Sequence, residues 1–467
     1  MPRSQTHTLE VTQSLFERAK SAFFSFGEDT ALVAVQHMLE QTIDLFDTIA
    51  GLGLSRQNMF ALGKVYSNSR PVIETLRSQG ITVVETTMPE PGKFDDYFAH
   101  DTEKLWQVAT EKLAGRRIKR VLVLDDGGMC ITSAPPELLQ RYAMCGVEQT
   151  SLGMFRFEEK PPSFAVFAWA RAAVKLEIGG PLFSQCLIDR LANELHDRKQ
   201  KQLGIIGMGS IGGAAANLAV REGRRVLYYD PRECLEIAPA LRSHVSPVES
   251  LEELMVRCDY VIGCSGRNPF QNNWPLQHRP GIKLVSASGG DQEFGPIIND
   301  LTTKPDFNVA PDTWDISSEH GPCGPIQIAY LGYPYNFVSR ARAAVPTHIV
   351  QLETGGLLAA LIQARIYLEF CEAGLGHNSG IYRVSPAAQK FVYEEWLKAM
   401  RDSRIDLCEI FGHHPATLRA AQHEVWLARN SEPRPSTRSV PLRILEHEMD
   451  QVVCRQCNPV ISRRAAG

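Results

Sequence analysis

Short apolar runs alternate with longer stretches of helical periodicity in the first part of the chain. Runs of strand length occupy residues 58–63, 81–85 and 119–128, and apolar residues recur at helical spacing over 69–80 and 96–114. This alternation is typical of β-α-β units, in which each helix returns the chain to a parallel sheet. The pattern therefore predicts a parallel α/β domain in this part of the chain.

The same alternation returns from residue 201 onward. Strands are expected over 203–207, 225–230, 259–266, 281–288 and 306–310, with helices over 210–222 and near 248–257. Between the two series, residues 163–178 and 181–201 are expected to form two helices broken at Gly179 and Gly180. The predicted fold class is α/β, with two doubly wound, Rossmann-like parallel sheets.

The apolar stretch 345–374 is expected to form one or two long helices around Gly355 and Gly356, which return the chain to the first domain. The first domain is then discontinuous, with residues 1–165 and 346–378, and the second domain, 201–345, is inserted into it. Residues 166–200 are expected to be a helical linker. Residues 379–467 are expected to be a helical and irregular C-terminal extension.

Composition narrows the classes of partner. Lys plus Arg (49) nearly balances Asp plus Glu (53), which gives a formal charge of -4. That balance does not favour nucleic acid or an anionic membrane surface. No apolar stretch approaches the roughly 18 uncharged residues of a membrane span. We therefore expect a cytoplasmic protein whose partners are a small-molecule substrate and, as a homo-oligomer, its own copies.

The cysteines indicate a reducing compartment. There are 11, and most lie in apolar stretches, as Cys145 and Cys186 do, so they are expected to be small buried hydrophobes. Cys454 and Cys457 have metal-type spacing, but a zinc ribbon requires a second such pair. No metal site is therefore predicted.

Residues 203–213 read LGIIGMGSIGG and contain the spacing of a dinucleotide-binding loop, with Gly207, Gly209 and Gly212. An apolar strand precedes the glycines, an Ala-rich helix follows them, and Asp230 ends the next strand about 20 residues on. The first glycine permits a tight turn, the second permits close approach of a pyrophosphate, and the third permits helix–strand packing. The second domain is therefore predicted to bind NAD.

The choice of cofactor depends on two residues after the second strand. Asp230 would accept hydrogen bonds from the adenosine ribose and repel a 2′-phosphate, which favours NAD over NADP, whereas Arg232 opposes this preference. The residues expected at the cofactor are Gly207, Gly209, Ser210, Ile211, Gly212, Asp230, Arg232, Cys264, Ser265, Gly266, Asn268, Ser288 and Gly289.

The order of segments over about 55–370 resembles S-adenosylhomocysteine hydrolase. The resemblance is carried by RPVIETLRSQGITV, VLVLDDGG, GVEQTSLGMFRF, the block from QCLIDRL through GIIGMGSIGG, and SASGGDQEFG. It implies tightly held NAD that oxidises the 3′-hydroxyl of a nucleoside substrate and is regenerated within each turnover.

The resemblance also assigns site residues, with substitutions. Asp126 matches the substrate-contacting aspartate of that family, while Lys64 stands for a histidine and Gln149 for a glutamate. Lys175 and Glu177 are the nearest substitutes for its lysine–aspartate pair, and Gly289 replaces a further histidine. These losses predict that the protein does not hydrolyse S-adenosylhomocysteine efficiently.

Three functions remain open. The first is a divergent NAD-dependent enzyme that oxidises a nucleoside or sugar-like substrate, with Lys64, Asp126 and Lys175 handling protons and His348 as a further base. The second is a non-catalytic, regulatory NAD-binding protein. The third is an oxidoreductase like the D-2-hydroxyacid dehydrogenases, which require an Arg, a Glu and a His after the glycine loop; the candidates are Arg267, Glu293, and His320 or His348.

Overall fold

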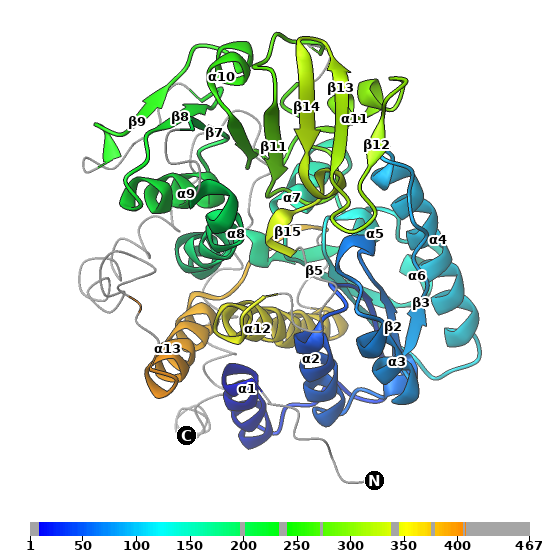
Figure 1. Ribbon diagram of the computed structural model, residues 1–467. Coiled ribbons are helices and arrows are strands. Elements are labelled where there is room, and N and C mark those ends of the chain that lie inside the picture. The colour runs from blue at the N-terminus through cyan, green and yellow to red at the C-terminus, as the bar shows by residue number, and fades with distance from the viewer. Residues whose placement is uncertain are drawn as a thin grey trace. The chain divides into compact units, whose positions relative to one another are not determined.

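The computed structural model describes residues 9–196, 201–232, 241–270, 274–337, 345–374, 379–404 and 407. Within these residues the chain forms two compact units, drawn in Figure 1. Unit 1 comprises residues from 9–86, 99–179 and 345–407, and unit 2 comprises residues from 87–98 and 180–337. Each unit contains its own sheet.

The sheet of unit 1 has seven parallel strands, in the order β15-β6-β5-β4-β1-β2-β3. Their bounds are β1 Thr30–Val35, β2 Met59–Leu62, β3 Thr82–Val84, β4 Arg120–Asp125, β5 Ala143–Glu148, β6 Ala165–Ala168 and β15 Gly380–Arg383. Every residue of β1 is buried. This agrees with its sequence, TALVAV, because a central parallel strand is covered on both faces.

Helices precede, connect and follow the strands of this sheet. They are α1 Glu10–Ser21, α2 Glu40–Gly51, α3 Arg70–Ser78, α4 Phe94–Leu113, α5 Met129–Thr132, α6 Pro136–Arg141, α7 Ser151–Glu159, α12 Thr347–Glu372 and α13 Pro386–Asp402. Among the described helices, α12 alone is long and apolar enough to cross a membrane, but 89% of its apolar window is buried inside the protein. It contacts β4, β5, α1, α2 and α13, and therefore serves as a core helix of unit 1.

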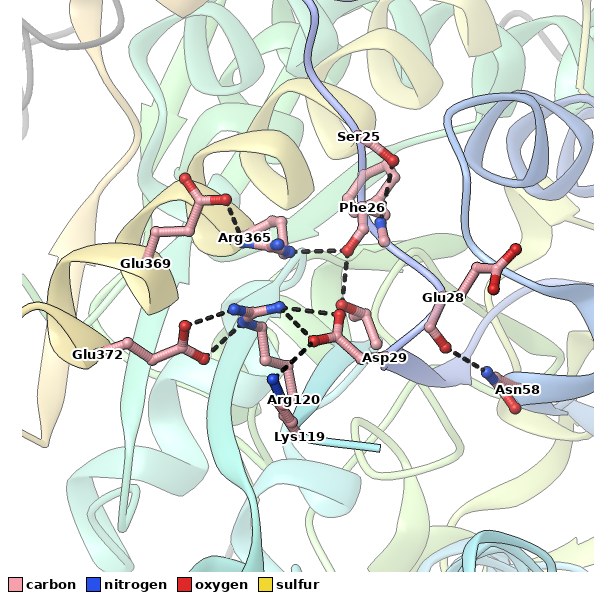
Figure 2. A network of polar contacts seen from close by, with 12 residues as sticks. Ser25, Phe26, Glu28, Asp29, Asn58, Lys119, Arg120, Arg365, Glu369 and Glu372 are labelled. Carbon is pink, nitrogen blue, oxygen red and sulfur yellow. Dashed lines mark hydrogen bonds and ion pairs between the residues drawn. The ribbon is translucent and has the colours of Figure 1, made fainter. Parts of the chain in front are cut away.

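A network of ion pairs ties the end of α12 to the start of two strands (Figure 2). Arg120, the first residue of β4, donates to both carboxylate oxygens of Asp29, at 2.8 and 2.9 Å. Its guanidinium also binds both oxygens of Glu372, the last residue of α12. Arg365 donates to the carbonyl of Phe26 at 2.8 Å. These contacts lie at the amino ends of β1 and β4, away from the carboxyl ends at which parallel sheets bind ligands.

The sheet of unit 2 has the order β12-β13-β14-β11-β10-β7-β8-β9. Its strands are β7 Leu203–Ile206, β8 Val226–Tyr229, β9 Val245–Pro247, β10 Tyr260–Gly263, β11 Ile282–Ser286, β12 Asn308–Val309, β13 Ile316–Gly321 and β14 Gly324–Ile328. All pairs are parallel except β12–β13 and β13–β14. The helices are α8 Gly180–His196, α9 Ser210–Arg221, α10 Leu251–Arg257 and α11 Gly295–Leu301. The predicted α/β class with two parallel, Rossmann-like sheets is confirmed.

Two predictions around the junctions are wrong. Residues 163–178 were expected to be helical, but residues 165–168 form the buried strand β6, followed by a π-helical turn at Lys175–Gly179. Periodicity cannot distinguish a short buried strand from a buried helix, and AVFA is such a run. The stretch from 379 was expected to be outside the sheets, yet β15 pairs in parallel with β6.

The long returning helix is continuous. α12 passes through Gly355 and Gly356 without a break, because both glycines serve packing: a Cβ on Gly356 would lie 2.0 Å from a ring carbon of Trp169, and one on Gly355 would lie 2.4 Å from Val11. Cys454 and Cys457, with the metal-type spacing, lie outside the described residues.

Candidate functional site

The glycine loop of unit 2 joins β7 to α9. Gly207 has a φ of +86°, and a Cβ there would lie 2.8 Å from Ser265 Cα. A Cβ on Gly212 would lie 1.9 Å from the carbonyl oxygen of Gly207. A Cβ on Gly209 would meet nothing within 4 Å. Gly207 and Gly212 are thus required by the neighbouring backbone. Gly209 instead leaves open space beside the first amides of the 12-residue helix α9, as a pyrophosphate-binding loop requires.

Asp230 follows β8 and is held by the loop. Its Oδ2 accepts from the Met208 amide at 2.7 Å and from Arg232 Nη2 at 2.6 Å. Its Oδ1 accepts from the backbone nitrogen of Arg232 at 3.0 Å and from Nε at 2.8 Å. Burial alone would raise the pKa of Asp230, but these bonds lower it below its usual value, so the group is ionised at neutral pH. About four acceptor positions of a carboxylate are thereby filled, and Arg232 must move before a ribose hydroxyl can bind there.

The loops after β10 and β11 meet the glycine loop. Gly266 donates its amide to Ser288 Oγ at 3.0 Å, and Ser265 lies against Gly207. Both hydroxyls, of Ser265 and Ser288, bind the buried carboxylate of Glu293. The structure therefore brings together Gly207, Ser265, Gly266 and Ser288 at the carboxyl ends of β7, β10 and β11.

The remaining predicted cofactor residues lie at the same ends of the strands. Ser210 and Ile211 begin α9, and the Ile211 carbonyl accepts from Ser184 Oγ at 2.8 Å. Asn268 Oδ1 accepts from the Phe270 amide at 3.0 Å. Cys264 directly follows β10, and Gly289 lies three residues after β11. Burial raises the pKa of the Cys264 thiol well above its usual value, so this group is neutral.

Unit 1 contains a second polar cluster, at the carboxyl ends of four adjacent strands. His37 follows β1, Lys64 follows β2, Asp126 follows β4 and Gln149 follows β5. Asp126 lies 3.2 Å from His37 Nε2 and 3.4 Å from Lys64 Nζ, and it accepts a hydrogen bond from Gln149. The strand order reverses between β1 and β4, since β2 and β3 extend the sheet on one side and β4 begins the other. A reversal of this kind is where open α/β sheets bind ligands.

Charge is unevenly distributed among the carboxyl groups of this cluster. Burial would raise the pKa of Asp126, but Lys64 and His37 lower it well below its usual value, so it is ionised. Burial raises the pKa of Asp125 to about 6, and it raises that of Glu148 well above its usual value, with the charge of Asp125 adding to the effect. Asp126 is therefore the firmly charged carboxylate of the three at neutral pH.

The predicted catalytic residues are not all in this cluster. Lys64 and Asp126 are brought together, whereas Lys175 forms an ion pair with Glu353 of α12. His348, the second residue of α12, accepts a hydrogen bond at its carbonyl oxygen from Trp396 Nε1. His37 was not predicted as a site residue. The signal for it is its position two residues after the apolar run TALVAV, which forms the buried strand β1.

The candidates of the dehydrogenase alternative are partly separated within unit 2. Glu293 binds the loop that contains Ser265, two residues before Arg267. His320 lies in β13, where Gly321 pairs with Gly324 at the start of β14, and β14 in turn pairs with the start of β11. His320 is thus at the amino end of β11, opposite the edge that Glu293 occupies, and its Nδ1 lies 3.1 Å from Asp306 Oδ1.

The strand order and the glycine loop of unit 2 define a Rossmann-type NAD-binding domain. Residues 184–271 match the family model "D-isomer specific 2-hydroxyacid dehydrogenase, NAD binding domain". NAD is therefore the cofactor of this domain type. The predicted cofactor, NAD, is confirmed at the level of this domain, whereas the individual residues expected to bind it stay a prediction.

Two proteins similar to this chain are an uncharacterized protein and a dehydrogenase. Uncharacterized protein Rv0104 of Mycobacterium tuberculosis is 28% identical over 319 residues, 66% of this chain and 58% of that protein. Erythronate-4-phosphate dehydrogenase of Pseudomonas syringae pv. tomato is 25% identical over 227 residues, 44% of this chain and 56% of that enzyme. The chain thus spans less than two thirds of the length of either relative. D-lactate dehydrogenase of Escherichia coli, covering 74% of this chain and 99% of its own, has 15% identity and a TM-score of 0.34.

These matches correct the resemblance to S-adenosylhomocysteine hydrolase, which is wrong. The matching family model is that of the D-isomer specific 2-hydroxyacid dehydrogenase NAD-binding domain instead, and one relative is a dehydrogenase. The misleading segments, such as VLVLDDGG and the glycine loop, are strand ends and turns of a kind that many Rossmann-like domains share. The hydrolase and nucleoside-oxidation functions rested on this resemblance and are therefore not supported.

Proposed function

We propose that the protein is an NAD-dependent oxidoreductase that interconverts a small hydroxy acid and the corresponding oxo acid. The observation that carries this proposal is the glycine loop within a domain of the 2-hydroxyacid dehydrogenase type: Gly207 and Gly212 are fixed by backbone contacts and Gly209 borders open space. NAD, when bound, supplies the hydride acceptor for the hydroxy acid. The rest of the chemistry requires a proton to leave the hydroxyl group, and protein side chains must accept it.

The polar cluster of unit 1, taken by itself, has groups suited to a hydroxy acid. Its donors are Lys64, His37 and Gln149, and its ionised acceptor is Asp126. His37 lies between Ser67 Oγ on Nδ1 and Asp126 on Nε2, so that a proton gained by the ring has a partner on either side. Donors of this kind suit the carboxylate of a hydroxy acid, and Asp126 suits its hydroxyl group. On this basis we assign Lys64, His37 and Asp126 to substrate binding within unit 1.

The experiment follows NADH absorbance with purified protein. A panel of 2-oxo acids is run with NADH, and a panel of 2-hydroxy acids, including 4-phosphoerythronate, is run with NAD. Gly209→Val should abolish NAD binding while the fold remains intact, because the added atoms enter open space. Gly213→Ala is the matched control, since its Cβ would lie 3.9 Å from the nearest atom outside the helix. Wild-type NAD binding by the Gly209→Val protein would disprove the assignment of the loop.

A second candidate function is regulation by NAD without turnover. The observation that favours it is the position of His320, which is at the opposite edge of the sheet from Glu293, so that these two do not form one catalytic set. The two functions differ in outcome. NAD binding with no change in NADH absorbance on any substrate of the panel supports regulation, and steady turnover supports the oxidoreductase.

A further inference from the structure

Glu293 is a fully buried carboxylate beneath the loop that follows β10. Its side chain lies over Gly263, the last residue of β10, where a Cβ would be 2.5 Å from Glu293 Cγ. Glu293 Oε1 accepts from the Ser265 amide at 2.9 Å and from Ser265 Oγ at 2.6 Å. Its Oε2 accepts from Ser288 Oγ. The strand therefore has a glycine where the carboxyl group needs room, and the loop supplies the donors.

The contacts continue from Glu293 to the glycine loop. Ser265 lies so close to Gly207 that a Cβ on Gly207 would be 2.8 Å from Ser265 Cα and 2.9 Å from its nitrogen. On the other side, Ser288 Oγ joins Glu293 to the amide of Gly266, which is 3.0 Å away. Glu293 thus fixes two consecutive residues of the β10 loop, and one of them is packed against the first glycine of the NAD loop.

We propose that Glu293 is a positioning residue for the cofactor: by holding Ser265 and Ser288, its carboxylate sets the β10 loop against Gly207 and so determines the affinity for NAD. The inference rests on the proposed NAD-dependent function. It differs from the role that the dehydrogenase alternative gave to Glu293, because the oxygens of this carboxyl group are occupied by loop donors.

The ionised form of Glu293 can accept from every one of these loop groups. The Ser265 amide can only donate, whereas the two serine hydroxyls can also accept, so protonation of the carboxyl group would reverse one hydroxyl contact and rearrange the loop hydrogen bonds. Burial raises the pKa of Glu293 to about 7. Cys264 is the titratable group that faces Glu293 from β10, and it is neutral because burial raises its thiol pKa. Arg267, further along the same loop, is exposed.

The test measures NAD dissociation constants of the full-length protein at pH 6, 7 and 8. One required ionisation with a pKa of about 7 predicts wild-type binding about tenfold weaker at pH 6 than at pH 8. Glu293→Gln imitates the protonated side chain, so its affinity should be no higher than that of the wild type at pH 6 and should stay constant across the range. Ser288→Ala removes the link to Gly266 and should weaken binding several-fold while the pH dependence remains.

Asp291→Asn is the matched control. Asp291 is also buried, and burial raises its pKa to about 7, but its carboxylate accepts from the Phe94 amide at 3.1 Å. This variant should keep the wild-type pH profile. A flat wild-type profile, or wild-type affinity in Glu293→Gln at pH 8, would overturn the proposal while leaving NAD binding established. Absence of wild-type binding at all three pH values would instead overturn the proposed function.

Discussion

His37 Nε2 lies 3.2 Å from Asp126 Oδ2, and this contact joins the carboxyl ends of β1 and β4, the neighbouring strands at which the sheet of unit 1 reverses its order. Ser67 Oγ holds the other ring nitrogen of His37 at 2.5 Å. The orientation of the imidazole is therefore fixed from both sides. A fixed ring beside an ionised carboxylate is suited to proton transfer, and it also makes the stability of this cluster depend on the charge of Asp126.

Replacing Asp126 with Asn should destabilise unit 1 at neutral pH. The change leaves the buried Lys64 beside a neutral amide, and breaking one partner of a buried pair costs about 3–5 kcal/mol of unfolding free energy. Because the folded-state pKa of Asp126 is below its unfolded value, its contribution is present above about pH 4 and is lost as the pH falls through the folded value. Urea unfolding followed by circular dichroism should show the two proteins converging in acid.

Glu148→Gln is the control for this prediction. Burial raises the pKa of Glu148 well above its usual value, which favours the protonated form that glutamine resembles. Glutamine also keeps the oxygen that accepts from the Thr150 amide at 2.7 Å. The expected loss is within about 1 kcal/mol. Equal losses in Asp126→Asn and Glu148→Gln would contradict the assigned charges.

The discrimination between NAD and NADP should depend on both Asp230 and Arg232. The ionised carboxylate predicts tighter binding of NAD, but Arg232 now neutralises it through two side-chain hydrogen bonds. Arg232→Ala should therefore widen the preference for NAD, by about tenfold, which corresponds to about 1.4 kcal/mol. Asp230→Ser should narrow it.

Fluorescence titration of each variant with NADH and NADPH measures this preference. Gly213→Ala again serves as a control, because Gly213 makes no contact with either side chain. A wild-type protein that prefers NADPH would refute the prediction and would make Arg232 the phosphate partner.

The elements of unit 2 that could be predicted are those with strong local patterns. The expected strand at 203–207 and helix at 210–222 match β7 and α9 to within a residue, because the glycines mark the boundary between them.

Two strands of unit 1, β6 and β15, were missed, since AVFA and GIYR are too short for any periodicity to show. Their identity as strands comes from pairing with each other and with β5, which is a long-range property.

The two candidate sites also differ in how far the sequence alone could predict them. The glycine loop and Asp230 lie within 30 residues of each other, and their spacing alone indicated the cofactor. The cluster of unit 1 requires the strand order, because His37, Lys64 and Asp126 become neighbours only when β1 is placed between β2 and β4. Lys175 was grouped with Asp126 although its partner is Glu353, a residue 178 positions away along the chain.

Gly356→Ala should destabilise unit 1 although alanine favours helices. The substitution gains about 1 kcal/mol of helix propensity, but its Cβ would lie 2.0 Å from the buried Trp169 ring, and overpacking costs typically 1–3 kcal/mol or more. We expect a lower midpoint of thermal unfolding. Gly213→Ala in α9, which has space for a Cβ, should be neutral or stabilising by up to about 1 kcal/mol. Stabilisation by Gly356→Ala would contradict the packing described for α12.

Arg120→Ala should remove the connection between α12 and the strands shown in Figure 2. Arg120 is 11% exposed and binds both oxygens of Asp29 and of Glu372, whereas Arg70, which pairs with Glu74, is 89% exposed. Partly buried bidentate pairs are screened little by salt, and exposed pairs contribute about 0–1 kcal/mol. We therefore expect Arg120→Ala to cost about 2–4 kcal/mol in urea unfolding, with little change between low and high salt.

Two further variants distinguish the geometry of the Arg120 network from its charge. Arg120→Lys keeps the charge but cannot form two bidentate pairs, so it should recover less than half of the loss. Arg70→Ala should change the unfolding free energy by less than about 0.5 kcal/mol. Full recovery by lysine would mean that charge alone holds the end of α12 at the sheet. A loss in Arg120→Ala no greater than that in Arg70→Ala would mean that the network of Figure 2 does not stabilise unit 1.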